Sequence, residues 1–591
     1  MKRLSSIAVV LGVVFACGDG RDGFGPNDHT SFEPIEGGAT PPPESCEGAV
    51  RCSRDLHEVV DACDDSRVIT TCAPDQGCAN GVCVPACDAA VGANASTGCE
   101  FVALPPTRFT FTAGSCFAAL VANTWGVPAR IEAEYAGEPV DVSVSGRKVR
   151  IEGADVSYSR FDGEIQPGEV AALFLSQQTN GTSAVPCPAG VTTAVQSDTA
   201  LTGTRRGRTF RIRTTAPVSA YSIYPFGGAA SAVSSATLLL PLSSWKNDYV
   251  VTNPWGLQVG RDDDGQVVRQ YYPTTQIVAA HDDTTVTVIG SVAITAGIDV
   301  EGAAAGEAKT YRLQRGEQLQ IAQDAELTGT RIGADKPVGV WSGHTCMKVP
   351  VNCCCDSAQT ELFPVQSWGR QYAVVPYISR ASGEIPEQYM YRITGAVDGT
   401  ALTYEPIRPK NAPVTLRAGE SVTFDSTTPF VVKSQDSAHP FAVFAYMTSF
   451  EYAEAQGRDG DPEFTTVIPT EQYLGRYVFF IDPSYLNSQL VVVRSRDESN
   501  ELHPVVLDCA GPLEGWTPIG HSGQHEYTRL WMTKGGAPQT VGSGTCSAGP
   551  HEIESKGPFA VTVWGTGRAS SYAYPGGAAL RSINHVETIV R

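Results

Sequence analysis

The sequence repeats itself, and this repetition constrains the fold more than any other feature of the chain. Four segments share a proline followed by alternating apolar residues: APVSAYSIYP (216–225), DKPVGVWSGH (335–344), AHPFAVFAYM (438–447) and KGPFAVTVWG (556–565). The prolines of these segments lie 120, 103 and 118 residues apart, at Pro217, Pro337, Pro440 and Pro558. Alternation after a proline is typical of a half-buried β-strand that is entered from a turn. Such segments at a regular spacing predict a β-repeat protein.

A second motif places an aromatic residue four positions after a proline and a tyrosine eight positions after it. The motif occurs three times without a change of spacing: Pro241, Trp245 and Tyr249; Pro364, Trp368 and Tyr372; Pro469, Tyr473 and Tyr477. Aromatic residues that recur at one position of a repeat usually fill the core rather than stack on a ligand. We therefore predict that these aromatic residues are core residues.

The spacing of both motifs predicts about four tandem antiparallel β units of 100–120 residues within residues 101–591. An all-β fold agrees with the composition, because 59 glycines, 39 prolines and only 18% charged residues suit turns better than long helices. The units could close into a propeller-like ring or stand as serial β-sandwiches. Closure would remove exposed sheet edges, which favours the ring.

Residues 1–17 have the pattern of a bacterial lipoprotein signal peptide. Lys2 and Arg3 precede an apolar run over residues 7–15, which is too short to span a membrane as a helix. Val14-Phe15-Ala16-Cys17 ends the run, and a small residue before a cysteine suits a lipobox. We expect Cys17 to carry a lipid that anchors the protein to the outer membrane or cell surface. The alternative is an ordinary signal peptide with a chance cysteine.

Two segments separate this peptide from the β units. Residues 18–45, with many Gly, Asp and Pro residues, predict a flexible linker. Residues 46–100 predict a small disulfide module, because too little apolar sequence lies between its cysteines for an unaided core. The eight cysteines of this module are Cys46, Cys52, Cys63, Cys72, Cys78, Cys83, Cys87 and Cys99. Their pairing stays open. Zinc is disfavoured because no C-x2-C pair occurs and His57 is the only histidine of residues 46–100.

The cysteines of the β units also favour disulfides. The chain has 17 cysteines, and removing Cys17 leaves an even number that an oxidising compartment would pair. Cys116 with Cys187 and Cys509 with Cys546 are the simplest assignments, since each pair stands alone between its neighbours.

The strongest candidate for chemistry is a cluster of cysteines near a histidine. Cys346 follows His344 by two residues, and the triplet Cys353, Cys354 and Cys355 lies close behind. We expect Cys346 to pair with one member of the triplet. Four free thiolates beside His344 would instead suit Cu(I) or Zn²⁺, and redox chemistry is a third possibility.

The charge balance and the motif content narrow the function. A formal net charge of −20 repels phosphate backbones and anionic membranes, so we expect no nucleic-acid partner and no membrane contact except through the lipid. The sequence has no Gly-x-Ser-x-Gly elbow, no His-Glu-x-x-His motif and no phosphate-cradling glycine loop. We therefore expect a protein that is not an enzyme, with no catalytic residue, metal or cofactor.

Several segments together carry a family resemblance: APVSAYSIYP (216–225), ATLLLPLSSWKNDYVV (236–251), DKPVGVWSGHTC (335–346), CCCDSAQTELFPVQSWGRQYAVVPY (353–377) and YRITGAVDGTALTYEP (391–406). They resemble the N-terminal domain family of IgG Fc-binding proteins, in the form found in Cys-rich bacterial surface lipoproteins of myxobacterial type. The resemblance covers roughly residues 98–580. It implies an extracellular adhesive or binding module with no assigned active site.

The resemblance also implies a disulfide between Cys346 and Cys355. Cys353 and Cys354 would then form either a vicinal disulfide or an open pair of thiols. We predict a lipid-anchored cell-surface binding or adhesion protein with an acidic β-repeat head and an unidentified extracellular protein or glycan ligand. Two alternatives remain: a secreted enzyme that acts on carbohydrate or peptide on a propeller-like fold, and a metal-handling surface protein that uses the Cys353–Cys355 cluster.

Overall fold

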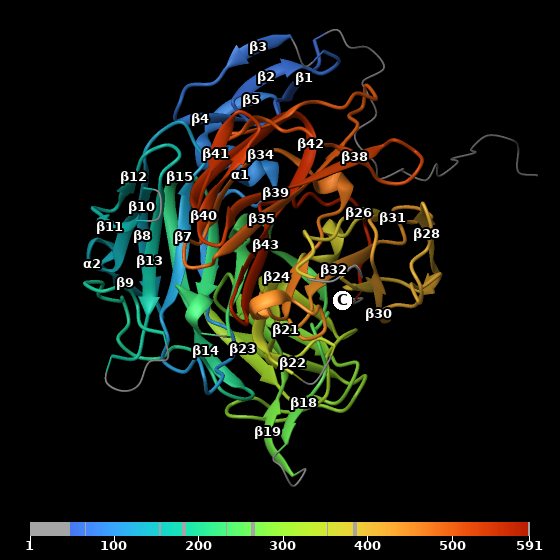
Figure 1. The fold of residues 1–591 in the computed structure, drawn as a ribbon. Coiled ribbons are helices and arrows are strands. Elements are labelled where there is room, and N and C mark those ends of the chain that lie inside the picture. Colours follow the sequence, from blue (N-terminus) through green and yellow to red (C-terminus); the bar gives the residue numbers. More distant parts are fainter. Residues whose placement is uncertain are drawn as a thin grey trace, which may run out of the picture. The chain divides into compact units, whose positions relative to one another are not determined.

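The structure, a computed structural model, describes residues 48–64, 67–152, 155–179, 185–231, 233–261, 266–350, 353–381 and 387–588. They belong to one compact unit, which extends over Gly38–Arg591. This part of the chain consists mainly of β-strands and the turns between them (Figure 1), which confirms the predicted all-β fold. Within it, no helix has the length and apolar character needed to cross a membrane.

The Cys-rich segment, residues 48–97, forms two small antiparallel sheets, β1-β2-β3 and β4-β5, followed by one helix. Its elements are β1 (Val50–Cys52), β2 (Glu58–Asp61), β3 (Val68–Thr71), β4 (Gln76–Ala79), β5 (Val82–Pro85) and α1 (Ala86–Ala93). The core of these sheets is small, and Val59 shares it with Cys72 and Cys78. A core of this size depends on disulfides for its stability.

Four repeats follow, which we name repeats I to IV. Repeat I (98–239) contains β6 (Gly98–Ala103), β7 (Phe117–Asn123), β8 (Ala129–Tyr135), β9 (Glu138–Val140), α2 (Val142–Ser145), β10 (Gly146–Glu152), β11 (Asp155–Arg160), β12 (Glu164–Ile165), β13 (Val170–Ser176), β15 (Phe210–Tyr224), η1 (Gly228–Ala230) and β16 (Ser235–Leu239). Strand β6 pairs with β15, so the boundary predicted at residue 100 falls within a strand of repeat I.

Repeat II (242–361) contains η2 (Leu242–Ser244), β17 (Lys246–Val250), β18 (Gln258–Arg261), β19 (Val267–Tyr271), β20 (Pro273–Ala279), β21 (Thr284–Ile289), β22 (Ala308–Leu313), β23 (Glu317–Ala322), β24 (Arg331–Met347) and β25 (Asp356–Glu361). Its sheet also takes in β14 (Arg205–Arg208), which precedes β15 in the chain and pairs with β23. The chain segment of repeat I therefore contributes a strand to the sheet of repeat II, which joins the two repeats.

Repeats III and IV complete the fold. Repeat III (365–466) contains η3 (Val365–Ser367), β26 (Gln371–Val374), β27 (Tyr389–Gly395), β28 (Thr400–Glu405), β29 (Thr415–Leu416), β30 (Ser421–Ser426), β31 (Phe430–Ser434), β32 (Phe441–Met447), η4 (Gln456–Arg458) and β33 (Glu463–Thr466). Repeat IV (470–575) contains η5 (Thr470–Gln472), β34 (Leu474–Ile481), β35 (Asn487–Ser495), β36 (Val505–Leu507), β37 (Gly511–Pro512), β38 (Thr517–Pro518), β39 (His525–Lys534), β40 (Ala537–Val541), β41 (Gly544–Cys546), β42 (Gly549–Gly567) and β43 (Ser570–Pro575).

The four repeats share one strand pattern. The first strand of each repeat pairs with a late strand of the same repeat, as β6 does with β15, β17 with β24, β26 with β31 and β34 with β42. A final strand then pairs with the strand before it, as β16 does with β15, β25 with β24, β33 with β32 and β43 with β42. The sequence repeats therefore correspond to structural repeats.

The final strands of the repeats decide between a ring and a row of sandwiches. Strand β16 lies against β25, β25 against β33, β33 against β43, and β43 returns to β16. The four repeats therefore close around a common axis that these inner strands surround. In Figure 1 they follow one another in chain order, from the cyan strands of repeat I to the red strands of repeat IV.

Hydrogen bonds at the axis join repeats I, II and IV through one carboxyl group. Asp356 of β25 accepts hydrogen bonds from Ser234 N of repeat I at 3.3 Å and from Ser571 N of repeat IV at 3.0 Å. Burial, together with the charges of Asp461 and Glu463 in repeat III, raises the pKa of Asp356 well above its usual range. Asp356 and Asp461 occupy equivalent positions, each eight residues before the repeated proline. The axis therefore holds a buried carboxyl cluster.

The recurring tyrosine of the second motif has the same role each time. Tyr249, Tyr372 and Tyr477 are buried, and each hydroxyl donates to the backbone oxygen of the residue that follows the repeated proline of the first motif. The acceptors are Val338 O at 2.7 Å, Phe441 O at 2.5 Å and Phe559 O at 2.5 Å. The two sequence motifs therefore contact each other, and these aromatic residues are core residues.

Replacing one of these tyrosines with phenylalanine is expected to destabilise the protein by about 1–3 kcal/mol, because a buried carbonyl loses its donor. In Tyr372→Phe, Gly369 N also loses its acceptor, the Tyr372 hydroxyl at 3.2 Å. Thermal unfolding followed by circular dichroism measures the effect. Tyr452→Phe is the control, since Tyr452 is exposed. Equal midpoints for the two variants would contradict this role of the tyrosine.

Candidate functional site

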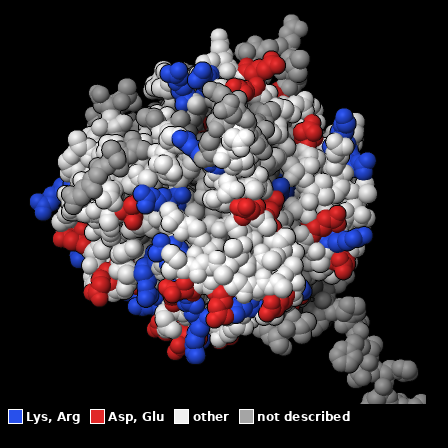
Figure 2. Space-filling view, turned by 90° about the horizontal axis from the view of Figure 1, so that it is seen from below, with Lys and Arg blue, Asp and Glu red and all other residues white. Residues whose placement is uncertain are grey.

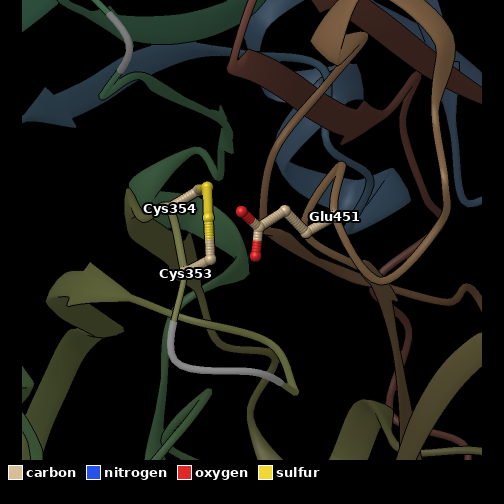
Figure 3. A group of neighbouring side chains, drawn as sticks. All are labelled: Cys353, Cys354 and Glu451. Atoms are coloured by element: carbon tan, nitrogen blue, oxygen red, sulfur yellow. A yellow bond between two sulfur atoms is a disulfide. The ribbon is translucent and has the colours of Figure 1, made fainter.

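The cysteine cluster near His344 consists of two disulfides. Cys346 at the end of β24 pairs with Cys355, and Cys353 pairs with its neighbour Cys354. Figure 3 shows the second disulfide beside the carboxylate of Glu451, and the sulfur and oxygen atoms of these three residues lie within 4.8 Å of one another. In this oxidised state the cluster offers disulfide sulfurs instead of the free thiolates that a soft metal prefers.

His344 is turned away from metal binding. Its Nδ1 accepts a hydrogen bond from Cys346 N at 3.1 Å, which places the ring proton on Nε2. Nε2 donates to Gly256 O at 3.0 Å. Burial lowers the pKa of His344 to about 4, so the ring is neutral at physiological pH. Both nitrogens therefore hold the backbone in place. The structure has the expected pairing of Cys346 with a member of the triplet, and the alternative of four free thiolates beside His344 is not assembled.

The other predicted cysteines also form disulfides in the described part of the chain. The pairs are Cys52–Cys78, Cys72–Cys83, Cys87–Cys99, Cys116–Cys187 and Cys509–Cys546. Cys63 is disulfide-bonded as well. Cys17 and Cys46 lie outside the described residues. Cys87–Cys99 joins α1 of the Cys-rich segment to β6 of repeat I. The other four pairs connect positions within one segment or repeat and brace local structure.

A cleft of about 870 Å³ lies between the Cys-rich segment and repeats I, III and IV. Its walls come from the loop after β1, the end of α1, the loop after β7, the start of repeat IV and the chain after β43. In Figure 1, β1, α1 and β34 lie near one another at the top of the view. Ligand sites of proteins commonly have volumes of about 300–1,000 Å³, so the cleft has room for a ligand of several rings or residues.

Arginine is the most frequent charged residue of this cleft. The lining contains six arginines and four acidic residues: Arg51, Arg54, Arg370, Arg476, Arg496, Arg581, Asp55, Glu471, Asp497 and Glu498. The whole chain, in contrast, has 43 basic and 63 acidic residues. On the face shown in Figure 2, basic and acidic side chains lie interspersed. The lining of the cleft therefore has more basic than acidic residues, whereas the whole chain has an excess of acidic residues.

Two of the arginines fix the walls of the cleft. Arg476 pairs with Glu552 through Nε and donates from Nη1 to Thr124 O at 2.6 Å. Arg496 donates to Gly523 O at 2.8 Å and to Asn500 O at 2.7 Å. These contacts connect repeat IV to repeat I and to its own loops, so both side chains have a structural role.

No motif of the sequence pointed to this cleft. Its arginines come from positions as distant as Arg51 and Arg581, and they do not occupy equivalent positions of the repeats. Their juxtaposition depends on closure of the ring and on docking of the Cys-rich segment, which sequence patterns do not specify. A run of consecutive basic residues could have predicted an anion-binding site, but the arginines of the cleft do not belong to such a run.

A disulfide-bonded all-β repeat fold with a polar cleft is typical of an extracellular or secreted protein. The IgGFc binding protein family matches residues 235–565, more than half of the chain, and the chain belongs to this family. The match begins at β16 and covers repeats II and III and most of repeat IV, a shorter range than the resemblance seen in the sequence.

One curated relative is the human IgGFc-binding protein, which is 29% identical over 168 residues. The aligned region is 28% of this chain and 3% of the relative's length. No solved structure matches the chain. Family membership together with the disulfides therefore indicates an extracellular binding protein, and the ligand is a separate question.

Proposed function

We propose that the protein is a cell-surface binding or adhesion protein without catalytic function that takes an extracellular ligand into the cleft. The observation that carries this proposal is the cleft itself, with a volume of about 870 Å³ and walls from four separate parts of the fold. Polar residues line it, and the disulfides Cys52–Cys78 and Cys87–Cys99 brace one wall. A site held in this way is already formed before a ligand arrives, which reduces the entropic cost of binding.

Family membership supports binding as the function, but it does not supply the ligand. The human relative is named for IgG Fc binding, and this chain spans 3% of its length. We therefore carry over the class of function and leave IgG Fc out of the proposal. The ligand class follows instead from the charges of the cleft.

We further propose that a lipid on Cys17 anchors the protein to the outer membrane or cell surface. The basic start and the lipobox support it, and Cys17 itself lies outside the described residues. Hydrocarbon burial of a lipid chain contributes about 0.8 kcal/mol per CH₂ to membrane binding. Mass spectrometry of the mature N-terminus tests this part, and an unmodified terminus at another residue would contradict it.

Blocking the cleft should abolish binding. Ala93 at the end of α1 lines the cleft, and Ala93→Trp would fill part of it without changing any charge. We expect cells that display the full chain to bind members of a panel of immobilised extracellular proteins and glycans, and the variant to bind at least tenfold less. Ala308→Trp is the matched control, since Ala308 is exposed on β22 outside the cleft. Equal binding by both variants would contradict a ligand site in the cleft.

A further inference from the structure

We infer that the cleft binds an acidic polysaccharide, whose carboxylate or sulfate groups are held by Arg54, Arg370 and Arg581. This inference rests on the proposed function and names the ligand class of the same site. All three side chains line the cleft and are exposed to solvent. They surround the segment 470–476 at the start of repeat IV, to which two of them make direct contact.

The guanidinium groups of these arginines have unused donors. Arg581 donates from Nη2 to Glu471 O at 3.0 Å, and Arg370 Nε lies 3.9 Å from Glu471 Oε1. Among the described residues, Arg54 has no hydrogen-bond or ion-pair partner. Partial burial and the nearby charge of Arg54 lower the pKa of Arg581, and the charge of Glu498 opposes this effect. Arg54 and Arg581 therefore lie close enough in the cleft for their like charges to repel, and an anion bound beside them would relieve this repulsion.

The four acidic residues of the cleft balance only part of the charge of its six arginines. Glu471 accepts a hydrogen bond from Arg370 N at 3.2 Å, and Glu498 lies 3.9 Å from Arg51 Nη1. The other two are used in local structure. Asp497 accepts from His503 Nε2 at 2.7 Å and from Glu501 N at 2.8 Å. Asp55 accepts from Ser53 Oγ at 2.6 Å and from His57 N at 3.2 Å. Their charges are directed into turns, whereas the free ends of the arginines face the cleft.

Oxygen anions with planar or tetrahedral geometry match guanidinium donors. Arginine presents several N–H groups in a rigid fork, which suits carboxylate and sulfate groups bound through two parallel hydrogen bonds. A polysaccharide that carries such groups at regular intervals would contact more than one arginine at once. The two sources of the oxyanion, uronic acids and sulfated sugars, share this chemistry.

The rest of the lining favours a sugar over a protein. Protein partners usually insert aromatic or aliphatic anchors, and they meet apolar pockets at the centre of an interface. Over the described residues, no large hydrophobic side chain that lines the cleft is exposed. The lining carries hydroxyl side chains instead, and those of Ser53, Thr97 and Thr470 are partly exposed. Such a surface forms hydrogen bonds with sugar hydroxyls.

The test measures binding of the full chain to immobilised polygalacturonate, dextran sulfate, neutral dextran and polyglutamate. We expect binding to at least one of the two acidic polysaccharides, with no binding to neutral dextran and a loss of affinity as salt rises. The double variant R54Q/R581Q should bind at least tenfold more weakly. The two acidic probes distinguish a carboxylate from a sulfate ligand.

The control removes the same charge elsewhere. Arg130 of β8 and Arg408 of the loop after β28 are exposed and do not line the cleft, so R130Q/R408Q should bind like the unchanged protein. Equal weakening in both double variants, or no binding to either acidic polysaccharide, would overturn the inference. Tighter binding to polyglutamate than to both polysaccharides would assign an acidic peptide instead. If Ala93→Trp blocks surface binding while R54Q/R581Q does not, the proposed function stands and this ligand class is wrong.

Discussion

Replacing the buried Glu387 with glutamine is expected to destabilise the protein by about 3–5 kcal/mol, the usual cost of breaking a buried ion pair. The side chains of Glu387 and Arg380 are both 0% exposed. The carboxylate accepts hydrogen bonds from Arg380 N at 2.9 Å, from Arg380 Nε at 3.1 Å and from Tyr377 OH at 2.5 Å. A neutral amide would leave the guanidinium charged, desolvated and without its partner.

The effect should extend through repeat III, because Arg380 also connects distant parts of the chain. It donates to Thr448 O at 2.9 Å, directly after β32, and to Asp459 O at 3.1 Å. These bonds hold the loop after β26 against the last part of the repeat. Denaturant unfolding followed by intrinsic fluorescence measures the change, and near-ultraviolet circular dichroism reports the loss of aromatic packing.

Two controls separate the buried charge from a general effect of substitution. Removing both charges in Arg380→Met with Glu387→Leu should recover much of the stability, since apolar replacements of a whole buried pair are often close to neutral. Asp283→Asn breaks an exposed pair with Arg312, whose side chains are 60% and 69% exposed, and should cost less than about 1 kcal/mol. A cost for Glu387→Gln no larger than that of Asp283→Asn would contradict the prediction.

The sequence predicted the repeats because their defining residues contact one another within each repeat. Tyr249, for example, donates to the backbone oxygen that follows Pro337, and both positions recur at a regular spacing. A side chain with the same partner in every copy leaves a periodic trace in the sequence. Ring closure was favoured for a general reason, the removal of sheet edges, and the contacts of the inner strands now show it.

The cleft and the axial carboxyl cluster left no such trace. The arginines of the cleft belong to segments that only meet when the Cys-rich segment docks on the closed ring. At the axis, Asp356 and Asp461 are equivalent, but repeat I has Val233 at that position, so the acidic residues do not recur in every copy. A search for repeated motifs does not find residues that contact each other only between repeats and that differ from one repeat to the next.

The carboxyl cluster at the ring axis should make stability depend on pH. Burial raises the pKa of Asp461 to about 8, and it raises the pKa of Asp356 and Glu463 well above their usual ranges. From about pH 4 to pH 8 the folded protein therefore keeps a proton on Asp461 that the unfolded chain has released. The stability contribution of this group is present at low pH and is lost as pH rises through that window.

Asp461→Asn should remove this dependence, because the amide resembles the protonated carboxyl and does not titrate. Relative to the unchanged protein, the variant should gain stability as pH rises from 5 to 8, by at most about 4 kcal/mol at 1.4 kcal/mol per pH unit for one proton. Thermal unfolding at pH 5, 6.5 and 8 measures the difference between the two proteins. The exposed Asp324 provides the matched control, and Asp324→Asn should show no difference that grows with pH. If the gap between Asp461→Asn and the unchanged protein stays constant over this range, the carboxyl at the axis is ionised in the folded state and the ring tolerates its charge.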